Sequence, residues 1–370
     1  MKFSAQREAI LTPLQHVAGA VERKQTSAIL GNVLLEAHDG YLTFTGSDSE
    51  IEVQARVEMH LDTEGSTTVP ARKFLDICKH LPESARIDFN YAADKVMLKT
   101  GRSRFTLATL QPDEFPKVGE LDNPKIVQLR AEDLYRCIKN TSFSMAQQDV
   151  RFYLNGLLLE ISADRVSCVA TDGHRLAYSQ CATDAHPEEP VKAIIPRKSV
   201  TELQRLLSTS EPDDIVDLRL TEQHLQIQAG GVRISTKLID GRFPDYNRVI
   251  PIDGDKEIII DCQTLRQSLT RASILSNEKY RGVRVALENG LLTITSNNPD
   301  QEESIDELEI DYQGLPTEIG FNVTYLLDVL AALDTENARL LIKDGGSSAL
   351  ITPEITENND SKYVVMPMRL

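Results

Sequence analysis

The sequence reads LQPDEFP at residues 110–116 and LIDGRFP at residues 238–244. Both segments end in phenylalanine and proline, and each closes a run of alternating, strand-like residues, at positions 87–107 and 216–238. A third run of this kind spans residues 339–368. Self-similarity at long intervals is the sequence signature of tandem units, so one structural plan is predicted to repeat along the chain.

A helix signal stands before each of these runs. Pro70, Pro196 and Asn322 begin three segments with helical periodicity, and both intervals between them are 126 residues. Proline suits the first position of a helix, where an N–H has no partner, and asparagine suits an N-cap. The equal spacing predicts three helices at corresponding positions of three repeats.

Each repeat also opens in the same way. Residues 7–21, 132–138 and 264–274 place apolar side chains at three- and four-residue intervals, which predicts amphipathic helices. Pro13 lies inside the first of them and indicates a kink or a late start. An alternating strand pair follows each helix, which predicts three hairpins. Their turn residues are Asp39-Gly40, Ala163-Asp164 and Asn289-Gly290.

The chain is therefore predicted to be an α+β protein of three tandem units. A length of 370 residues is too long for one small core, and units of about 120 residues are a common domain size. Polar stretches near residues 121–125 and 252–256 suit domain boundaries. We expect domains at residues 1–124, 125–253 and 254–370.

Composition excludes several classes of protein. A hydrophobic share of 41% is typical of a globular chain. There is no apolar run of about 18 residues and no signal peptide, so we expect a soluble, cytoplasmic protein without a membrane partner. The five cysteines lie far apart without a CxxC pair, which argues against a zinc site and against a disulfide framework. No cofactor-binding motif is present, and no cofactor or metal is expected.

The net charge of −16 argues at first against nucleic acid, since a basic chain is usual for DNA binding. The six predicted helical segments with their flanks, however, carry +7 together, which leaves −23 for the remainder. Residues 263–284 contribute +4, whereas residues 321–340 contribute −2. Helices that share one surface would make that surface attract phosphate. Charged helical faces also serve solubility alone, so the charge pattern by itself leaves both interpretations open.

Ten further segments resemble one family along essentially the whole chain. They are MKF at 1–3, TVPARKF at 68–74, GRSRF at 101–105, FSMA at 143–146, DVR at 149–151, YLNG at 153–156, ATDGHRLA at 170–177, DGRFPDY at 240–246, ILSNEK at 274–279 and YVVMPMRL at 363–370. Through these segments, in this order, the sequence resembles bacterial DNA polymerase III beta subunits, the beta sliding clamps.

The resemblance implies a head-to-tail homodimer that closes into a ring, with helices lining the hole and antiparallel sheets outside. Duplex DNA would pass through the hole without sequence readout, held by phosphate-directed contacts. By matching position, the DNA-facing residues are Lys24, Arg72, Gln148, Phe152 and Tyr153. Lys24 and Phe152 depart from the arginine and tyrosine of the family, since lysine lacks the guanidinium fork and phenylalanine lacks a hydroxyl.

The resemblance also implies an apolar cleft that takes short peptide motifs rich in Gln, Leu and Phe. The replicative DNA polymerase, the clamp loader and repair proteins would dock there. The matching residues are Leu154, Thr171, Gly173, His174, Arg175, Leu176, Pro244, Arg248, Val249, Ser348, Val364, Met366, Pro367 and Met368. Leucine, valine, methionine and proline would form the pocket, with arginine and histidine on its rim. The alternative for residues 364–368 is a core strand.

The dimer contact is expected between the first domain of one chain and the third of the other. A basic edge with Lys99 and an acidic stretch with Asp300 and Glu307 would meet around an apolar centre, because rim ion pairs contribute little alone. The main interface residues are Lys73, Ile77, Lys95, Arg102, Arg104, Phe105, Leu107, Ile274, Leu275, Glu302, Glu303 and Asp306.

Two other classes of function are considered. Asp172 and His174 could form an acid–base pair in a hydrolase, with Ser167 or Ser179 as nucleophile, but no GxSxG, Walker, HExxH or GxGxxG motif accompanies them. A three-repeat scaffold that binds acidic partners rather than DNA is the second alternative. Loading onto circular DNA would separate these classes.

Overall fold

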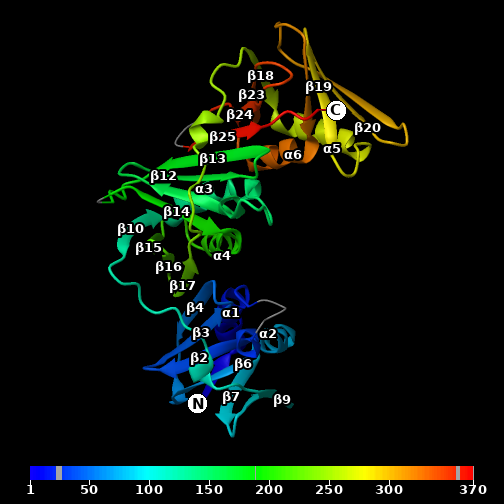
Figure 1. Ribbon diagram of the computed structural model, residues 1–370. Helices are drawn as coiled ribbons and strands as arrows, with labels where there is room; N and C mark the ends of the chain where they lie inside the picture. The colour runs from blue at the N-terminus through cyan, green and yellow to red at the C-terminus, as the bar shows by residue number, and fades with distance from the viewer. Residues whose placement is uncertain (22–26, 188, 356–358, 370) are drawn as a thin grey trace. The chain divides into compact units, whose positions relative to one another are not determined.

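The computed structural model falls into two compact units. Figure 1 labels helices and strands of both units. The structure describes residues 1–21, 27–187, 189–355 and 359–369. Every strand pairing within the described residues is antiparallel. Helices and antiparallel sheets are both present in each unit, in agreement with the predicted α+β class.

The first unit comprises residues 1–132 and 198–238. It contains a five-stranded sheet in the order β5-β1-β7-β8-β9 and an eight-stranded sheet in the order β10-β15-β16-β17-β4-β3-β2-β6. The strands are β1 (Lys2–Gln6), β2 (Asn32–His38), β3 (Tyr41–Ser47), β4 (Ile51–Glu58), β5 (Leu61–Thr63), β6 (Gly65–Pro70), β7 (Arg86–Ala92), β8 (Lys95–Thr100), β9 (Ser103–Ala108), β10 (Lys125–Arg130), β15 (Ile215–Leu220), β16 (His224–Ala229) and β17 (Val232–Lys237). Helix α1 (Arg7–Ala18) packs against α2 (Ala71–His80) and against β3 and β4, and most of α4 (Arg197–Leu207) also belongs to this unit.

The second unit comprises residues 133–197 and 239–370. Its eight-stranded sheet has the order β14-β11-β12-β13-β25-β24-β23-β18, and its four-stranded sheet has the order β21-β20-β19-β22. The strands are β11 (Gly156–Ile161), β12 (Arg165–Thr171), β13 (Arg175–Ala182), β14 (Val191–Pro196), β18 (Lys256–Asp261), β19 (Gly282–Glu288), β20 (Leu291–Asn297), β21 (Glu303–Glu309), β22 (Thr317–Asn322), β23 (Asn337–Ile342), β24 (Ala349–Pro353) and β25 (Asn359–Val365). Helices α5 (Cys262–Ile274) and α6 (Val323–Ala332) pack together, and most of α3 (Ala131–Lys139) lies in this unit.

The two eight-stranded sheets join segments that are far apart in the sequence. In the first unit β17 pairs with β4, and in the second β13 pairs with β25. The middle third of the chain therefore supplies strands to both sheets. Such pairing satisfies backbone groups that would otherwise lie on exposed sheet edges. Local periodicity indicates the runs that contain β17 and β25, but it does not indicate β4 or β13, and it does not reveal these long-range partners.

The predicted helices and hairpins are present, with differences at helix starts. α1 begins at Arg7 and contains Pro13, so the expectation of a late start is wrong. Pro70 and Pro196 are the last residues of β6 and β14, one position before the helices that they were expected to begin. Both strands are sheet edges, where a missing N–H is tolerated. Asn322 caps α6 as predicted, because its side chain accepts from Thr324 N.

Turn geometry explains why the first hairpin reverses where it does. Asp39 and Gly40 join β2 to β3, and both have positive φ, 53° and 75°. Two successive positive φ values give a turn whose twist matches that of the flanking strands, and aspartate–glycine is among the pairs that tolerate it. The five cysteines are free, and all except the half-buried Cys262 are buried, as expected of small core side chains.

Candidate partner-binding cleft and nucleic-acid surface

An apolar cluster covers one face of the eight-stranded sheet in the second unit. Buried Leu176 on β13 lies opposite Val364 on β25, and Val364 lies opposite Leu350 on β24. Residues directly opposite one another share a sheet face, so this register gathers apolar side chains from three strands. The buried members are Leu158, Val169, Leu176, Ile194, Phe243 and Val364, with Tyr153, Tyr178, Ile239, Tyr246, Val249, Ile250 and Leu350 packed against them. Three predicted cleft residues, Leu176, Val249 and Val364, thus lie together.

A tight turn at residues 171–174 borders this cluster. Asp172 Oδ1 accepts hydrogen bonds from the backbone N–H groups of His174 and Arg175, at 2.9 and 3.0 Å. Thr171 Oγ1 donates to Arg175 O at 2.6 Å and accepts from Gly173 N at 3.1 Å. Gly173 has φ +88°, a conformation that L side chains rarely adopt. The ATDGHR sequence therefore builds a locked turn at the start of β13.

The tail segment, residues 366–369, leaves the sheet beside that turn. Val364 and Val365 are completely buried core residues of β25, so the core-strand alternative holds for these two. Met366 lies beyond the strand with 36% of its surface exposed, and its N–H donates to His174 O at 2.9 Å. Met368 N donates to Gly320 O at 2.8 Å. One backbone hydrogen bond thus joins the tail to the turn and a second joins it to β22, and the Met366 side chain is partly exposed.

The remaining predicted cleft residues differ in exposure. Leu154 is buried in the 3-10 helix η4 (Phe152–Asn155), whereas Ser348 and Thr171 are half-buried. Pro244 and Arg248 are exposed on the segment that carries Phe243 and Val249 into the cluster. The apolar cluster is therefore buried, and exposed or half-buried side chains, including those of Thr171, Arg248 and Ser348, lie on the segments that border it.

Arg175 does not lie on the rim, which corrects the sequence-based expectation. Only 11% of its side chain is exposed. Its Nε donates to Asp172 Oδ2 at 3.1 Å, Nη1 to Asp328 Oδ2 at 2.5 Å, and Nη2 to Phe143 O at 2.7 Å. The guanidinium also lies 4.4 Å from the centre of the Tyr325 ring. Charge-assisted hydrogen bonds to a planar guanidinium fix its geometry, so Arg175 braces the site from within.

The residues that contact the Arg175 guanidinium were not identified from the sequence. Asp328 entered the sequence argument only as a charge on a helical segment, and Tyr325 and Phe143 were not considered as site residues. All three pack around Arg175 from α6 and from the 3-10 helix η3 (Ser142–Ser144). No local signal marks them, because Asp328 is 153 residues from its partner.

Substitution of Gly173 tests the turn. We expect Gly173→Ala to lower the free energy of unfolding by about 1–2 kcal/mol, because a side chain is strained at positive φ. A Cβ would also lie 2.8 Å from Nη2 of Arg151. Peptide binding should weaken as the turn shifts. Gly230→Ala is the matched control, since Gly230 also has positive φ but nothing within 4 Å of its Cβ position. Denaturant unfolding gives the stability of both variants, and peptide titration gives their affinities. Equal peptide affinities for the two variants would contradict the role of the turn.

Three of the four predicted DNA-facing residues that the structure describes are exposed, whereas Tyr153 is half-buried against the apolar cluster. Arg72 is exposed on α2 in the first unit, whereas Gln148 lies in a loop of the second unit and Phe152 and Tyr153 begin the 3-10 helix η4 that follows that loop. Phe152 is 56% exposed and makes an edge-on ring contact with Tyr153 at 5.9 Å. Lys24 lies outside the described residues. Accessible aromatic and amide groups on one segment suit backbone-directed contact with nucleic acid.

An ion pair organises this loop. Asp149 accepts hydrogen bonds from the backbone N–H and from the guanidinium of Arg151, at 2.8 to 3.0 Å. These bonds lower the pKa of Asp149 to about 2. The charge of Arg151 is therefore balanced within the loop, and the exposed uncharged side chains of this segment are Gln147, Gln148, Val150 and Phe152.

Several of the predicted dimer residues lie at two sheet edges, and the others lie on or next to helices or on the neighbouring strand β8. β9 is the outermost strand of the five-stranded sheet, and Arg102 and Arg104 are exposed beside and on it. β21 is the outermost strand of the four-stranded sheet and carries the exposed Glu303. Ile274, at the end of α5, is 74% exposed. The other predicted interface residues lie on or next to β8, β9, α2, α5 and β21, namely Lys73, Ile77, Lys95, Phe105, Leu107, Leu275, Glu302 and Asp306. Asp306 already pairs with Arg271 of its own chain at 2.6 Å.

The arrangement around Asp172 gives no support to a hydrolase. Its carboxylate is committed to the turn and to Arg175, as described above. Ser167 and Ser179, the candidate nucleophiles, are buried on strands at 5% and 0% exposure. Ser179 Oγ accepts from Ser361 Oγ at 3.0 Å. Asp172 is therefore a structural residue of the turn rather than half of an acid–base pair.

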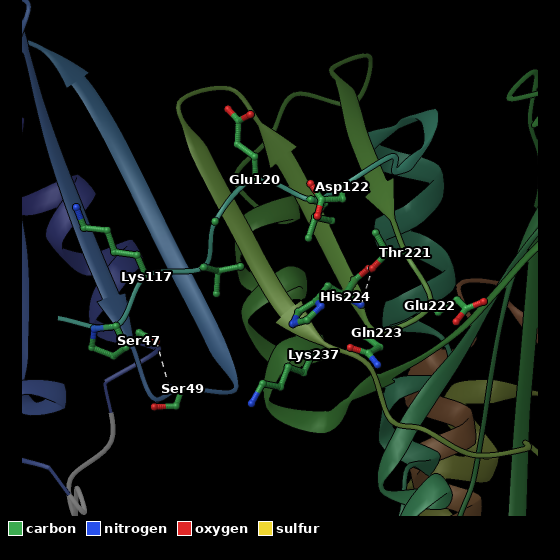
Figure 2. Close-up of a pocket in the computed structure, with 14 residues that line it drawn as sticks. Ser47, Ser49, Lys117, Glu120, Asp122, Thr221, Glu222, Gln223, His224 and Lys237 are labelled. Atoms are coloured by element: carbon green, nitrogen blue, oxygen red, sulfur yellow. Dashed lines mark hydrogen bonds between the residues drawn. The ribbon is translucent and has the colours of Figure 1, made fainter. Parts of the chain in front are cut away.

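A cavity of about 670 Å3 lies elsewhere, within the first unit and beneath residues 116–122. Figure 2 shows Ser47 and Ser49 on one side of it and His224 and Lys237 on the other. None of the predicted site residues lines this cavity. Its size alone does not make it the functional site, because the residues with matching chemistry gather around the apolar cluster of the second unit.

The segment above the cavity is fastened to the sheet by polar contacts. Val118 N donates to Glu52 Oε2 at 2.7 Å, and Gln226 Nε2 donates to Gly119 O at 3.2 Å. Burial raises the pKa of Glu52, which this N–H and nearby cations partly offset. The described residues contain no cluster of three or more His, Cys, Asp or Glu side chains suited to a metal. Nor does any helix among them have the length and apolar character needed to cross a bilayer.

Comparison with known proteins divides the chain into three successive domains. Three family models match in order: the N-terminal domain of the DNA polymerase III beta subunit over residues 1–119, its central domain over residues 128–245 and its C-terminal domain over residues 247–369. The beta sliding clamp of Pseudomonas putida is 49% identical over 371 residues, covering 100% of both chains.

Solved structures of sliding clamps are also similar to this chain over its whole length. A sliding clamp from Pseudomonas aeruginosa bound to griselimycin has a TM-score of 0.95 and 48% identity, and one from Bartonella birtlesii bound to griselimycin has 0.96 and 34%, each with 100% of both chains covered. These matches confirm three tandem domains built from helices and antiparallel sheets.

Proposed function

This chain belongs to the DNA polymerase III beta subunit family, and we propose that it acts as a DNA sliding clamp, a homodimeric ring that encircles duplex DNA and tethers the replicative polymerase for processive synthesis. The observation that carries this proposal is the match of all three family domains, in order, along the chain. As a member of this family it is a processivity factor and not an enzyme. The decisive experiment is retention on circular DNA, which is argued in the Discussion.

Contact with DNA is proposed to be independent of sequence. Arg72, Gln148, Phe152 and Tyr153 offer a cation, an amide and two rings, which suit the phosphate backbone and sugars rather than base edges. Lys24 is included on the resemblance alone. The helical segments carry +7 against −23 elsewhere, so the phosphates would be drawn to the helices and repelled by the remaining surface.

Head-to-tail pairing is proposed between β9 of one chain and β21 of its partner. Both are sheet edges, and unpaired edges favour addition of another strand. Exposed Arg102 and Arg104 flank one edge, and exposed Glu302 and Glu303 flank the other. Ile274, which is 74% exposed in the single chain, would be covered. Since a basic edge meets an acidic one, the pairing joins unlike ends and can close a ring.

Removing the apolar centre of that contact should favour monomers. We expect Ile274→Ala combined with Leu275→Ala to raise the dimer dissociation constant by about a hundredfold, because truncated interface anchors cost about 2 kcal/mol or more. Mass measurement by light scattering across a dilution series gives the constant. Ile355→Ala is the matched control, since Ile355 is also exposed, at 64%, but lies away from both edges. A double variant that stays as dimeric as the parent would refute the placement of the interface.

The cleft of the second unit is proposed to receive the polymerase, the clamp loader and repair proteins through short peptide motifs. A buried floor of Leu176 and Val364, with an accessible Met366 beside it, suits apolar anchor residues in an otherwise disordered partner segment. The relatives from P. aeruginosa and B. birtlesii bind griselimycin. Competition between griselimycin and a peptide rich in Gln, Leu and Phe would place both ligands at one site of this chain.

We further propose domain boundaries at residues 1–124, 125–253 and 254–370. The first boundary falls in the stretch between β9 and β10 and the second in the stretch between β17 and β18. The chain would work in the cytoplasm, where bacterial DNA is replicated. Limited proteolysis would cut first within these two stretches if they are the domain linkers.

A further inference from the structure

The negative charge of α6 and its flanks is not explained by a role on DNA. Residues 321–340 carry −2, whereas each of the other five predicted helical segments is positive. Two of the acidic residues in this segment hold cations from the middle third of the chain. Asp328 pairs with Arg175, and Asp334 pairs with Lys139 at 3.4 Å. Two of the three acidic residues of this segment, Asp328 and Asp334, therefore have cationic partners within the second unit.

The two ion pairs differ in burial. The side chains of Arg175 and Asp328 are 11% and 36% exposed, against 40% and 62% for Lys139 and Asp334. Exposed pairs contribute little, because solvent screens them. A guanidinium withdrawn from water behaves differently, since losing one partner leaves a charge without compensation. Asp328 is thus expected to matter to its surroundings, and Asp334 is not.

The Arg175 guanidinium connects three separate elements. Nε binds Asp172 in the turn, Nη1 binds Asp328 on α6, and Nη2 binds the carbonyl of Phe143 on η3. The guanidinium is planar and presents its donors in fixed directions, so its three partners hold it in one orientation. Removing the Asp328 carboxylate leaves Nη1 of Arg175 without its partner on α6.

Hydrogen bonds of the turn at residues 171–174 connect the Arg175 guanidinium to the tail segment. Asp172, which accepts from Arg175 Nε, also accepts from the backbone N–H of His174. The carbonyl of His174 then accepts from Met366 N. A continuous series of hydrogen bonds therefore runs from α6 through Arg175 and the turn to the tail segment.

We propose that Asp328 is a positioning residue of the partner-binding cleft. Acting through Arg175, it fixes the turn at residues 171–174 and the His174 carbonyl that anchors Met366. This inference rests on the proposed function, because it assumes that the cleft binds partner peptides. Asp328 itself belongs to the brace behind the turn and not to the apolar floor.

The experiment measures binding of a fluorescein-labelled synthetic peptide rich in Gln, Leu and Phe to the full chain. We expect Asp328→Ala to weaken binding about tenfold, in the range of couplings between residues of one hydrogen-bond network. Asp328→Asn keeps an acceptor without charge and should fall between Ala and the parent. Asp328→Glu restores the carboxylate and should recover part of the affinity. Asp334→Ala, which removes the exposed acid of the same segment, should bind as the parent does.

A double-mutant cycle separates positioning from general loss of stability. If Asp328 acts through Arg175, the variant with both Asp328→Ala and Arg175→Ala should bind no more weakly than Arg175→Ala alone. Thermal unfolding and dimer mass are recorded for each variant. Additive losses, or an Asp328→Ala chain that binds the peptide as the parent does, would overturn the inference. A parent chain that fails to bind the peptide would instead count against the proposed function of the cleft.

Discussion

Deletion of residues 366–370 is expected to abolish peptide binding while the dimer still forms. The deletion starts one residue after β25 ends, so the buried Val364 and Val365 keep their places in the sheet. It removes Met366, the accessible apolar side chain beside the cluster, and both backbone hydrogen bonds of the tail segment. Buried anchors cost about 2 kcal/mol or more each when truncated, and every 1.4 kcal/mol is about tenfold in affinity. We therefore expect a loss of a hundredfold or more.

Peptide affinity and dimer mass are measured on the same preparations. Met366→Ala should lose most of the affinity on its own. Met97→Ala is the matched control, because Met97 is equally exposed, at 38%, but lies on β8 of the first unit. A deletion variant that keeps the affinity of the parent would show that the cleft has been placed wrongly. A variant that also loses the dimer would show that the tail supports the fold.

On nicked circular DNA, the loaded protein should survive a salt wash that removes it from the same DNA after linearisation. A conventional protein held by 6–10 phosphate contacts loses about 10³–10⁵ in affinity between 50 and 200 mM salt. A closed ring is held by topology, so salt weakens its contacts without releasing it. The modest charge of +7 on the helical segments agrees with retention that does not depend on tight contacts.

The measurement is the fraction of protein that remains with DNA during gel filtration at high salt, after loading by a clamp loader. Cutting the circle once after loading gives the control, since charge, sequence and length are unchanged. Arg72→Ala should leave retention on the circle almost unaltered, because a single phosphate contact does not hold a ring. Equal loss from the circular and linear forms would contradict encirclement and leave ordinary electrostatic binding as the explanation.

Much of the fold can be predicted from the sequence because the signals are local. The apolar periodicity of residues 264–274 predicts α5, and Asp39-Gly40 predicts the first hairpin. These signals depend on neighbours within a turn of helix or across a two-residue loop. The proline positions are wrong by one residue, since proline is equally acceptable at the end of an edge strand and at the start of the helix that follows.

The arrangement of the site follows only in part. Leu176 and Val364 are apolar in sequence, and the resemblance assigns both to one cleft, which their register supports. Arg175 shows where this reasoning fails. An arginine after histidine suggests a polar rim, and only the fold brings Asp328, from a helix 153 residues away, to bury it. Long-range pairing of charges, like the pairing of β17 with β4, leaves no periodic trace in the sequence.

The pairing of β13 with β25 has a consequence for the newly made protein. Strand β13 ends at Ala182, and its partner β25 starts at Asn359. At a bacterial elongation rate of about 5–20 residues per second, the ribosome needs roughly 9–35 s to pass from one to the other. During that interval β13 is an unpaired edge, open to chaperones or to another nascent chain. Val364 of β25 belongs to the apolar cluster, so the partner binding proposed for this cleft requires a chain that has been synthesised past residue 365.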